Sequence, residues 1–63
     1  MVLKIFSRVQ FVGKQHAELS AGDIGYIIED FGDGNYEVEF SNPDGSTRAQ
    51  AVVNEKEIVL KPT

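Results

Sequence analysis

The chain has 63 residues, no cysteine and a formal net charge of −4 at pH 7. A chain of this length supports one domain with one small hydrophobic core, and the lack of cysteine excludes disulfides and thiolate-ligated metals. No apolar run approaches the roughly 20 residues that cross a bilayer, and the amino-terminal residues lack the apolar segment of a signal peptide. We therefore expect one cytoplasmic domain over residues 1–63 that does not engage a membrane.

The acidic residues are concentrated in the middle of the sequence. Residues 15–47 contain eight of the ten acidic residues and none of the six Lys and Arg residues. Because nucleic-acid binding depends on contacts from Lys and Arg to phosphate, this distribution disfavours it. The basic residues all lie in the flanks, at Lys4, Arg8, Lys14, Arg48, Lys56 and Lys61.

Short apolar runs separated by Gly, Asn, Asp and Pro, without a helical period, predict an all-β fold. The first strand is expected over residues 4–12, where Ile5, Val9 and Phe11 would share the inner face. A polar loop follows, and from it Leu19 is expected to reach back into the core.

The second strand is expected over residues 24–31, and two phases compete for its inner face. The candidates are Ile24, Tyr26 and Ile28 for one side, and Ile27 and Phe31 for the other. A β-bulge near Gly25 would reconcile the two phases, because glycine within a strand often marks a bulge. The pattern alone leaves this register open.

Two turn signals frame the third strand. Asp33 and Gly34 are typical of a two-residue hairpin turn, in which both central residues need positive φ. After this turn, apolar and acidic residues alternate from Tyr36 to Phe40. The apolar residues are therefore expected inside the fold, with Glu37 and Glu39 outside.

The sequence Asn-Pro-Asp-Gly at residues 42–45 predicts the next turn, with positive φ at Gly45. The fourth strand is expected over residues 47–53. A register that keeps the inner residues of both strands on one face is favoured. This register gives the pairs Glu39–Arg48 and Phe40–Thr47.

The carboxyl-terminal segment predicts one 3-10 turn capped by Asn54, followed by a short fifth strand that Pro62 ends. Five short strands, a long first loop, tight hairpins and this 3-10 turn are typical of a small five-stranded SH3-like barrel. Closing the sheet into a barrel protects most strand edges. An OB-type barrel is the alternative, although that fold usually needs a longer chain.

The segments LSAGDIGYIIED (residues 19–30), YEVEF (36–40) and Asp44-Gly45 resemble a family of small prokaryotic proteins known only as a domain of unknown function. The resemblance covers nearly the whole chain. It implies an SH3-like barrel, no established activity and no site residues to transfer. The opening of the same motif, G-D-x-G-x-[VI], is similar to the KOW element of ribosomal and transcription-factor barrels, which implies contacts with RNA or protein.

Catalytic and metal-binding interpretations are weaker than structural ones. His16 lies in a polar loop without a Ser-His-acid spacing, so an exposed loop residue is favoured. Asp30, Asp33, Asn35 and Glu37 carry oxygen ligands suited to calcium, but their spacing differs from an EF-hand loop. Glu37 and Glu39 form a carboxylate pair, but a small barrel does not provide the deep pocket that glycosidase-like chemistry needs. We therefore expect no enzyme, no metal and no cofactor.

The remaining hypothesis is a protein-binding module. An exposed aromatic residue on an acidic surface suits a protein partner with a basic surface, because complementary charge steers and orients association. An antitoxin-like or immunity-like protein and an accessory subunit of a larger complex are two forms of this hypothesis, and a KOW-like RNA-binding barrel is the alternative. The candidate protein-binding residues are Tyr26, Glu29, Asp30, Glu37 and Glu39.

Overall fold

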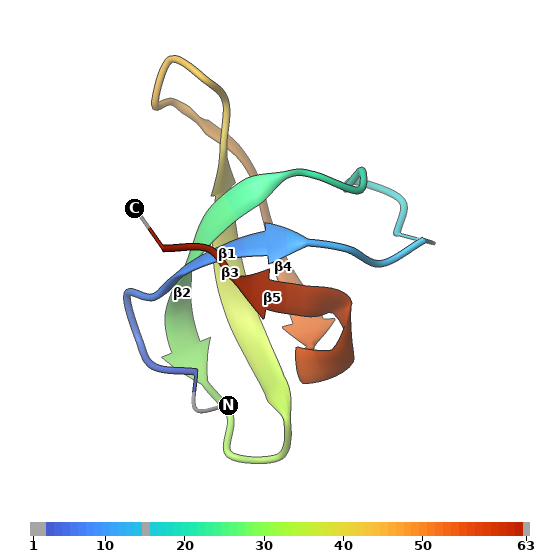
Figure 1. Cartoon of the computed structure of the whole chain (residues 1–63), viewed down its shortest axis with the longest axis vertical. Helices are drawn as coiled ribbons and strands as arrows, with labels where there is room; N and C mark the ends of the chain where they lie inside the picture. The colour runs from blue at the N-terminus through green and yellow to red at the C-terminus, as the bar shows by residue number, and fades with distance from the viewer. Residues whose placement is uncertain (1–2, 15, 63) are drawn as a thin grey trace.

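The computed structural model describes residues 3–14 and 16–62, which form an all-β fold of five antiparallel strands in one sheet (Figure 1). The spatial order of the strands is β4-β3-β2-β1-β5. A 3-10 turn, η1, precedes the last strand. The bounds are Arg8–Phe11 for β1, Ile24–Asp30 for β2, Asn35–Ser41 for β3, Thr47–Asn54 for β4, Glu55–Glu57 for η1 and Ile58–Leu60 for β5.

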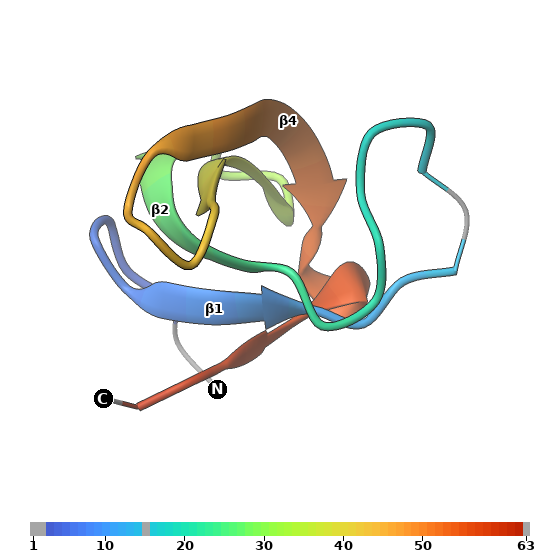
Figure 2. The same ribbon diagram turned by 90° about the horizontal axis from the view of Figure 1, so that it is seen from above.

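The sheet is strongly curved, so that its strands wrap around a common interior (Figure 2). Among the described residues no ladder joins β4 to β5, and strand pairing therefore leaves the sheet open between these two edges. The same residues include no helix long and apolar enough to cross a membrane.

A single apolar cluster fills the concave side of the sheet. Phe11 and Phe40 meet edge to face at its centre, with ring centroids 6.2 Å apart. Leu19 packs into this cluster from the long first loop, which confirms its predicted role. The buried members are Leu3, Val9, Phe11, Leu19, Ile27, Tyr36, Val38, Phe40, Val53 and Ile58.

Strand β1 is shorter than predicted. Val9 and Phe11 are buried as expected, but the strand begins only at Arg8. The preceding residues form a turn instead, in which the Ser7 amide donates to the Lys4 carbonyl at 3.0 Å. Ile5 lies in this turn and is 47% exposed, so its predicted inner position is wrong.

Strand β2 places Gly25 and Ile27 on the inner face. The bulge lies at Ile28 and not near Gly25. Ile27 pairs with Val38 and Glu29 pairs with the adjacent Glu37, so Ile28 has no partner in the ladder. Gly25 has another role. A Cβ atom at this position would lie only 2.6 Å from the Glu39 carbonyl oxygen, so β2 and β3 could not approach as closely.

The hairpin between β2 and β3 has a three-residue loop, and the predicted two-residue turn is wrong. The Phe31 amide donates to the Asn35 carbonyl at 3.2 Å, which extends the ladder by one pair. Positive φ occurs at Gly32 (81°) and Gly34 (91°) and not at Asp33. Both left-handed positions are thus occupied by glycine, which adopts them without strain.

The register between β3 and β4 also differs from the prediction. Phe40 pairs with Ala49, and Glu39 pairs with Gln50, which lies two residues beyond the predicted partner. The extra residue is Arg48, because Ser41 pairs with Thr47 across an irregularity in the ladder. The predicted turn itself is confirmed, with φ of 90° at Gly45.

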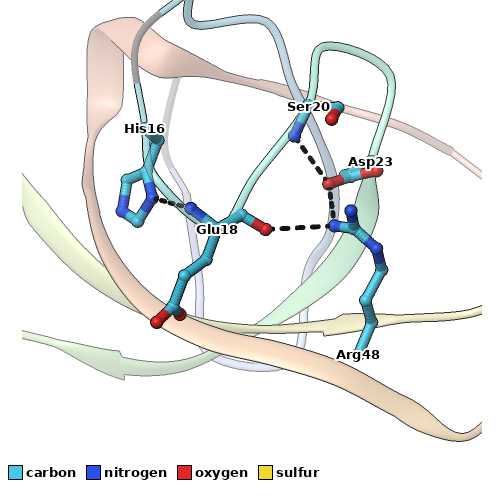
Figure 3. Close-up of polar contacts among 5 residues, drawn as sticks. All are labelled: His16, Glu18, Ser20, Asp23 and Arg48. Atoms are coloured by element: carbon cyan, nitrogen blue, oxygen red, sulfur yellow. Dashed lines mark hydrogen bonds and ion pairs between the residues drawn. The ribbon is translucent and has the colours of Figure 1, made fainter.

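The contacts of the Arg48 side chain account for the irregularity in the ladder. Its guanidinium donates to the Asp23 carboxylate at 2.5 Å and to the Glu18 carbonyl at 3.2 Å (Figure 3). Asp23 also accepts from the Ser20 amide at 2.8 Å. Arg48 lies outside the regular strand pairing, and its hydrogen bonds connect β4 to the long first loop.

The 3-10 turn and its cap are as predicted. The Asn54 side chain accepts from the Lys56 amide at 3.0 Å, and the Glu57 carboxylate accepts from the Asn54 amide at 2.9 Å. This reciprocal pair satisfies amides that the short turn leaves without backbone partners. The Glu57 backbone carbonyl also accepts a hydrogen bond from the Val12 amide at 2.7 Å, next to the pairing of β5 with β1.

Candidate protein-binding face

Four of the five predicted site residues share the outer side of β2 and β3. Tyr26 pairs directly with Glu39, and beyond the bulge Glu29 pairs directly with Glu37. Their side chains point away from the core, since the alternate β3 residues are buried. We call Tyr26, Glu29, Glu37 and Glu39 the outer face.

Asp30, the fifth predicted residue, does not belong to the outer face. It pairs with the buried Tyr36 at the end of the ladder. Its exposed carboxylate accepts from the Gly32 amide at 2.9 Å. A side-chain acceptor for a turn amide two residues on is a common way to stabilise such a loop. The structure therefore gives Asp30 a local role in the hairpin.

The outer face places like charges against each other. Directly opposed residues in an antiparallel pair have Cβ atoms about 4.5–5.5 Å apart, and Glu29 opposes Glu37. Glu37 also accepts a hydrogen bond from the Gln50 side chain on β4. Across the described part of the chain, the ion pair within 4 Å joins Arg48 to Asp23 and involves none of the outer-face acids.

The aromatic member of the outer face is accessible. Tyr26 is 42% exposed, and it lies between Glu39 on one neighbouring strand and Arg8 on the other. A groove of about 590 Å³ adjoins it on the side of the β3–β4 turn. The residues lining this groove include Arg8, Asp23, Ile24, Tyr26, Asn42 and Pro43.

Sequence reasoning found Tyr26 but missed the rest of this groove. Its walls come from three strands and a turn, and the pairing of Arg8 with Tyr26 depends on a register across the long first loop. A tight turn constrains the register of the two strands that it joins, whereas the twelve residues between Phe11 and Ile24 do not. Pro43 was recognised as a turn residue, and nothing in its local pattern placed it beside Ile24.

Burial and nearby negative charge affect the ionisation of Tyr36, which lies near the β2–β3 hairpin. Burial raises the pKa of the Tyr36 hydroxyl above its usual value, and the carboxylates of Asp30 and Glu55 raise it further. Each of these acids favours the neutral form of the tyrosine. Asp30 and Glu55 therefore place negative charge near the Tyr36 hydroxyl at the hairpin end of the sheet.

His16 has a structural environment. Its Nδ1 atom accepts from the Glu18 amide at 3.3 Å (Figure 3), and its ring meets that of Phe11 edge to face at 6.1 Å between centroids. It is half-buried, whereas an exposed side chain was predicted. Within residues 3–14 and 16–62, no three His, Cys, Asp or Glu side chains are grouped so that they could hold a metal ion.

The sheet from β1 to β5 corresponds to a known family. A family model described as a domain of unknown function, DUF4926, matches residues 8–60. The chain belongs to this family. The matched range starts at the first residue of β1 and ends at the last residue of β5, which confirms the resemblance inferred from the sequence motifs. Comparisons with curated proteins and with solved structures found no match.

Proposed function

We propose that this protein is a non-enzymatic binding module that docks a basic partner protein against its outer face. The proposal includes an SH3-like barrel as the scaffold, which the curved five-stranded sheet and the 3-10 turn before β5 support. An antitoxin-like or immunity-like protein that neutralises a basic protein is one form of this function. An accessory subunit of a larger complex is the other.

The opposition of Glu29 and Glu37 is the observation that carries the proposal. Like charges directly opposite each other destabilise a sheet by a few tenths of a kcal/mol to about 1 kcal/mol. As far as this repulsion is concerned, folding favours a neutral or basic residue of similar strand propensity at one of the two positions. A basic surface placed over the pair removes the repulsion, so the charge that opposes folding favours binding.

The neighbourhood of the acids also suits a protein partner. Tyr26 adds an accessible aromatic ring beside Glu39, and aromatic residues surrounded by polar groups are typical of protein interfaces. Glu37 and Glu39 lie on an open strand face and not within the groove. This openness supports recognition over acid–base catalysis, which needs a water-excluding pocket.

Affinity capture from host-cell lysate tests this function. The bait proteins are the wild type, a face variant carrying Glu29→Gln, Glu37→Gln and Glu39→Gln, and a control that changes the same charge elsewhere. We expect the wild type and the control to retain a protein of high isoelectric point at low salt, and the face variant to lose it. The control variant carries Glu18→Gln, Asp33→Asn and Glu55→Gln.

Two results contradict the proposal. Retention of the same partner by the face variant, with circular dichroism showing all three baits folded, would place binding elsewhere on the surface. Nuclease-sensitive capture would favour the KOW-like RNA-binding alternative, because nucleic acid would then hold the partner to the bait.

A further inference from the structure

Phe6 combines two unusual properties. Its side chain is 76% exposed, the highest value among the large hydrophobic residues of 3–14 and 16–62. Its φ is 70°, and within the described part of the chain it is the one non-glycine residue with positive φ. A bulky aromatic side chain in this left-handed region is rare, because its Cβ crowds the following carbonyl.

Hydrogen bonds on both sides fix this conformation. The Ser7 amide donates to the Lys4 carbonyl at 3.0 Å, which closes a turn around Phe6. The Phe6 amide donates to the Ile27 carbonyl at 2.6 Å, and the Ile27 amide donates back to the Ser7 carbonyl at 3.0 Å. The turn is therefore attached to β2, and the exposed ring adds no core packing that would offset its strain. Strain of this kind clusters at functional sites.

The turn stands at the edge of the outer face. Phe6 bonds to Ile27, and Tyr26 is the preceding residue of β2. Glu29 lies two residues beyond Ile27 on the same strand, across the bulge at Ile28. The backbone of Phe6 therefore lies beside the part of β2 that carries Tyr26 and Glu29.

We propose that Phe6 is the apolar anchor of the interface, inserting into an apolar pocket of the basic partner while Tyr26 and Glu29 contact its rim. The inference rests on the proposed function and identifies the residue that gives most of its affinity. Interfaces concentrate binding energy in a few aromatic residues inside a polar rim. The net charge of −4 on each copy opposes a second copy as the occupant.

The strain is tested first, without a partner. We expect Phe6→Gly to raise Tm by about 4–8 °C, because glycine adopts positive φ freely and the lost side chain was exposed. Ile5→Gly is the matched control in the same turn. It should lower Tm, because Ile5 has no positive φ to relieve. A lower Tm for Phe6→Gly would overturn the claim that Phe6 is retained against folding stability.

Binding is tested with two synthetic peptides of equal length, one alternating Lys with Leu and the other alternating Lys with Ser. We expect the wild type to prefer the Lys-Leu peptide by about tenfold, and Phe6→Gly to remove that preference while leaving Lys-Ser binding unchanged. Phe31→Ser, which alters another exposed aromatic residue at the hairpin, should keep the preference.

Failure of the inference and failure of the proposed function are distinguishable. Equal binding of both peptides to the wild type, or a preference that survives in Phe6→Gly, would overturn the role of Phe6 alone. No binding of either peptide would overturn the proposed function as well. Lys4 and Arg8 flank the turn, so a thymidine oligonucleotide serves as a third probe. Tight binding of this oligonucleotide that depends on Phe6, or self-association that Phe6→Gly abolishes, would also overturn the proposal.

Discussion

Replacing Gly25 by alanine tests the close approach of β2 and β3, on which the geometry of the outer face depends. The added Cβ would lie 2.6 Å from the Glu39 carbonyl oxygen, 2.8 Å from Val38 Cγ1 and 2.9 Å from Phe40 Cδ1. The first of these contacts is with the backbone, so rotation of a side chain cannot relieve it. Overpacking of this kind costs about 1–3 kcal/mol, whereas a chain of this length has a total stability of about 3–9 kcal/mol.

Urea unfolding followed by circular dichroism measures the effect. With an m value of about 1 kcal/mol/M, the midpoint for Gly25→Ala should fall by about 1–3 M. Gly32 is the control, because its φ is 81° and a Cβ there meets nothing within 4 Å. Asparagine tolerates positive φ better than alanine does. Gly32→Asn should therefore be milder than Gly32→Ala, while Gly25→Asn should be worse than Gly25→Ala.

A neutral or stabilising Gly25→Ala would refute this reasoning. Gly→Ala substitutions that fit the native backbone without strain stabilise proteins by about 0.4–1 kcal/mol. That outcome would mean that β2 and β3 are further apart than described. The direct pairing of Tyr26 with Glu39, and with it the outer face, would then need revision.

Three further outcomes are expected. In a Tyr26→Phe variant, absorbance titration of the remaining Tyr36 should show a pKa above 10.0. Because the fold favours neutral Tyr36, its contribution to stability is full below pH 10.0 and is lost as the pH rises through the raised pKa. The Ser46 hydroxyl and amide hold the pKa of Asp44 below 3.8, so its contribution is lost as the pH falls through that lower pKa, and Ser46→Ala should move the NMR titration midpoint of Asp44 upward. Phe40→Ala should lower the free energy of unfolding measured in urea by about 3–5 kcal/mol, because Phe40 is fully buried.

The inner faces of β1 and β3 could be predicted because they depend only on a period of two along the chain, whereas the pattern left two phases open for β2. Val9 and Phe11 are buried as the pattern indicated, and so are the apolar residues from Tyr36 to Phe40. Ile5 does not follow the same pattern, because it lies in the Lys4–Ser7 turn and the strand begins only at Arg8. Periodicity does not report where such a turn intervenes.

The registers could not be predicted, because each depends on a contact made at a distance in the sequence. Arg48 leaves the β3–β4 ladder where it binds Asp23, 25 residues away. A register shift of two residues keeps every side chain on its face, so the apolar pattern could not detect it. The predicted site was partly recoverable for the same reason. Glu37 and Glu39 follow from alternation alone, whereas joining them to Glu29 required the bulge at Ile28.

The most direct test of the central claim is a map of the captured partner on the backbone amides of the isotope-labelled protein. Amide shifts on titration should centre on Tyr26, Glu37 and Glu39, and they should weaken as salt rises, because charge complementarity is screened by ions. Shifts confined to the exposed side of β4 around Val52, with the outer-face amides unmoved, would contradict the account.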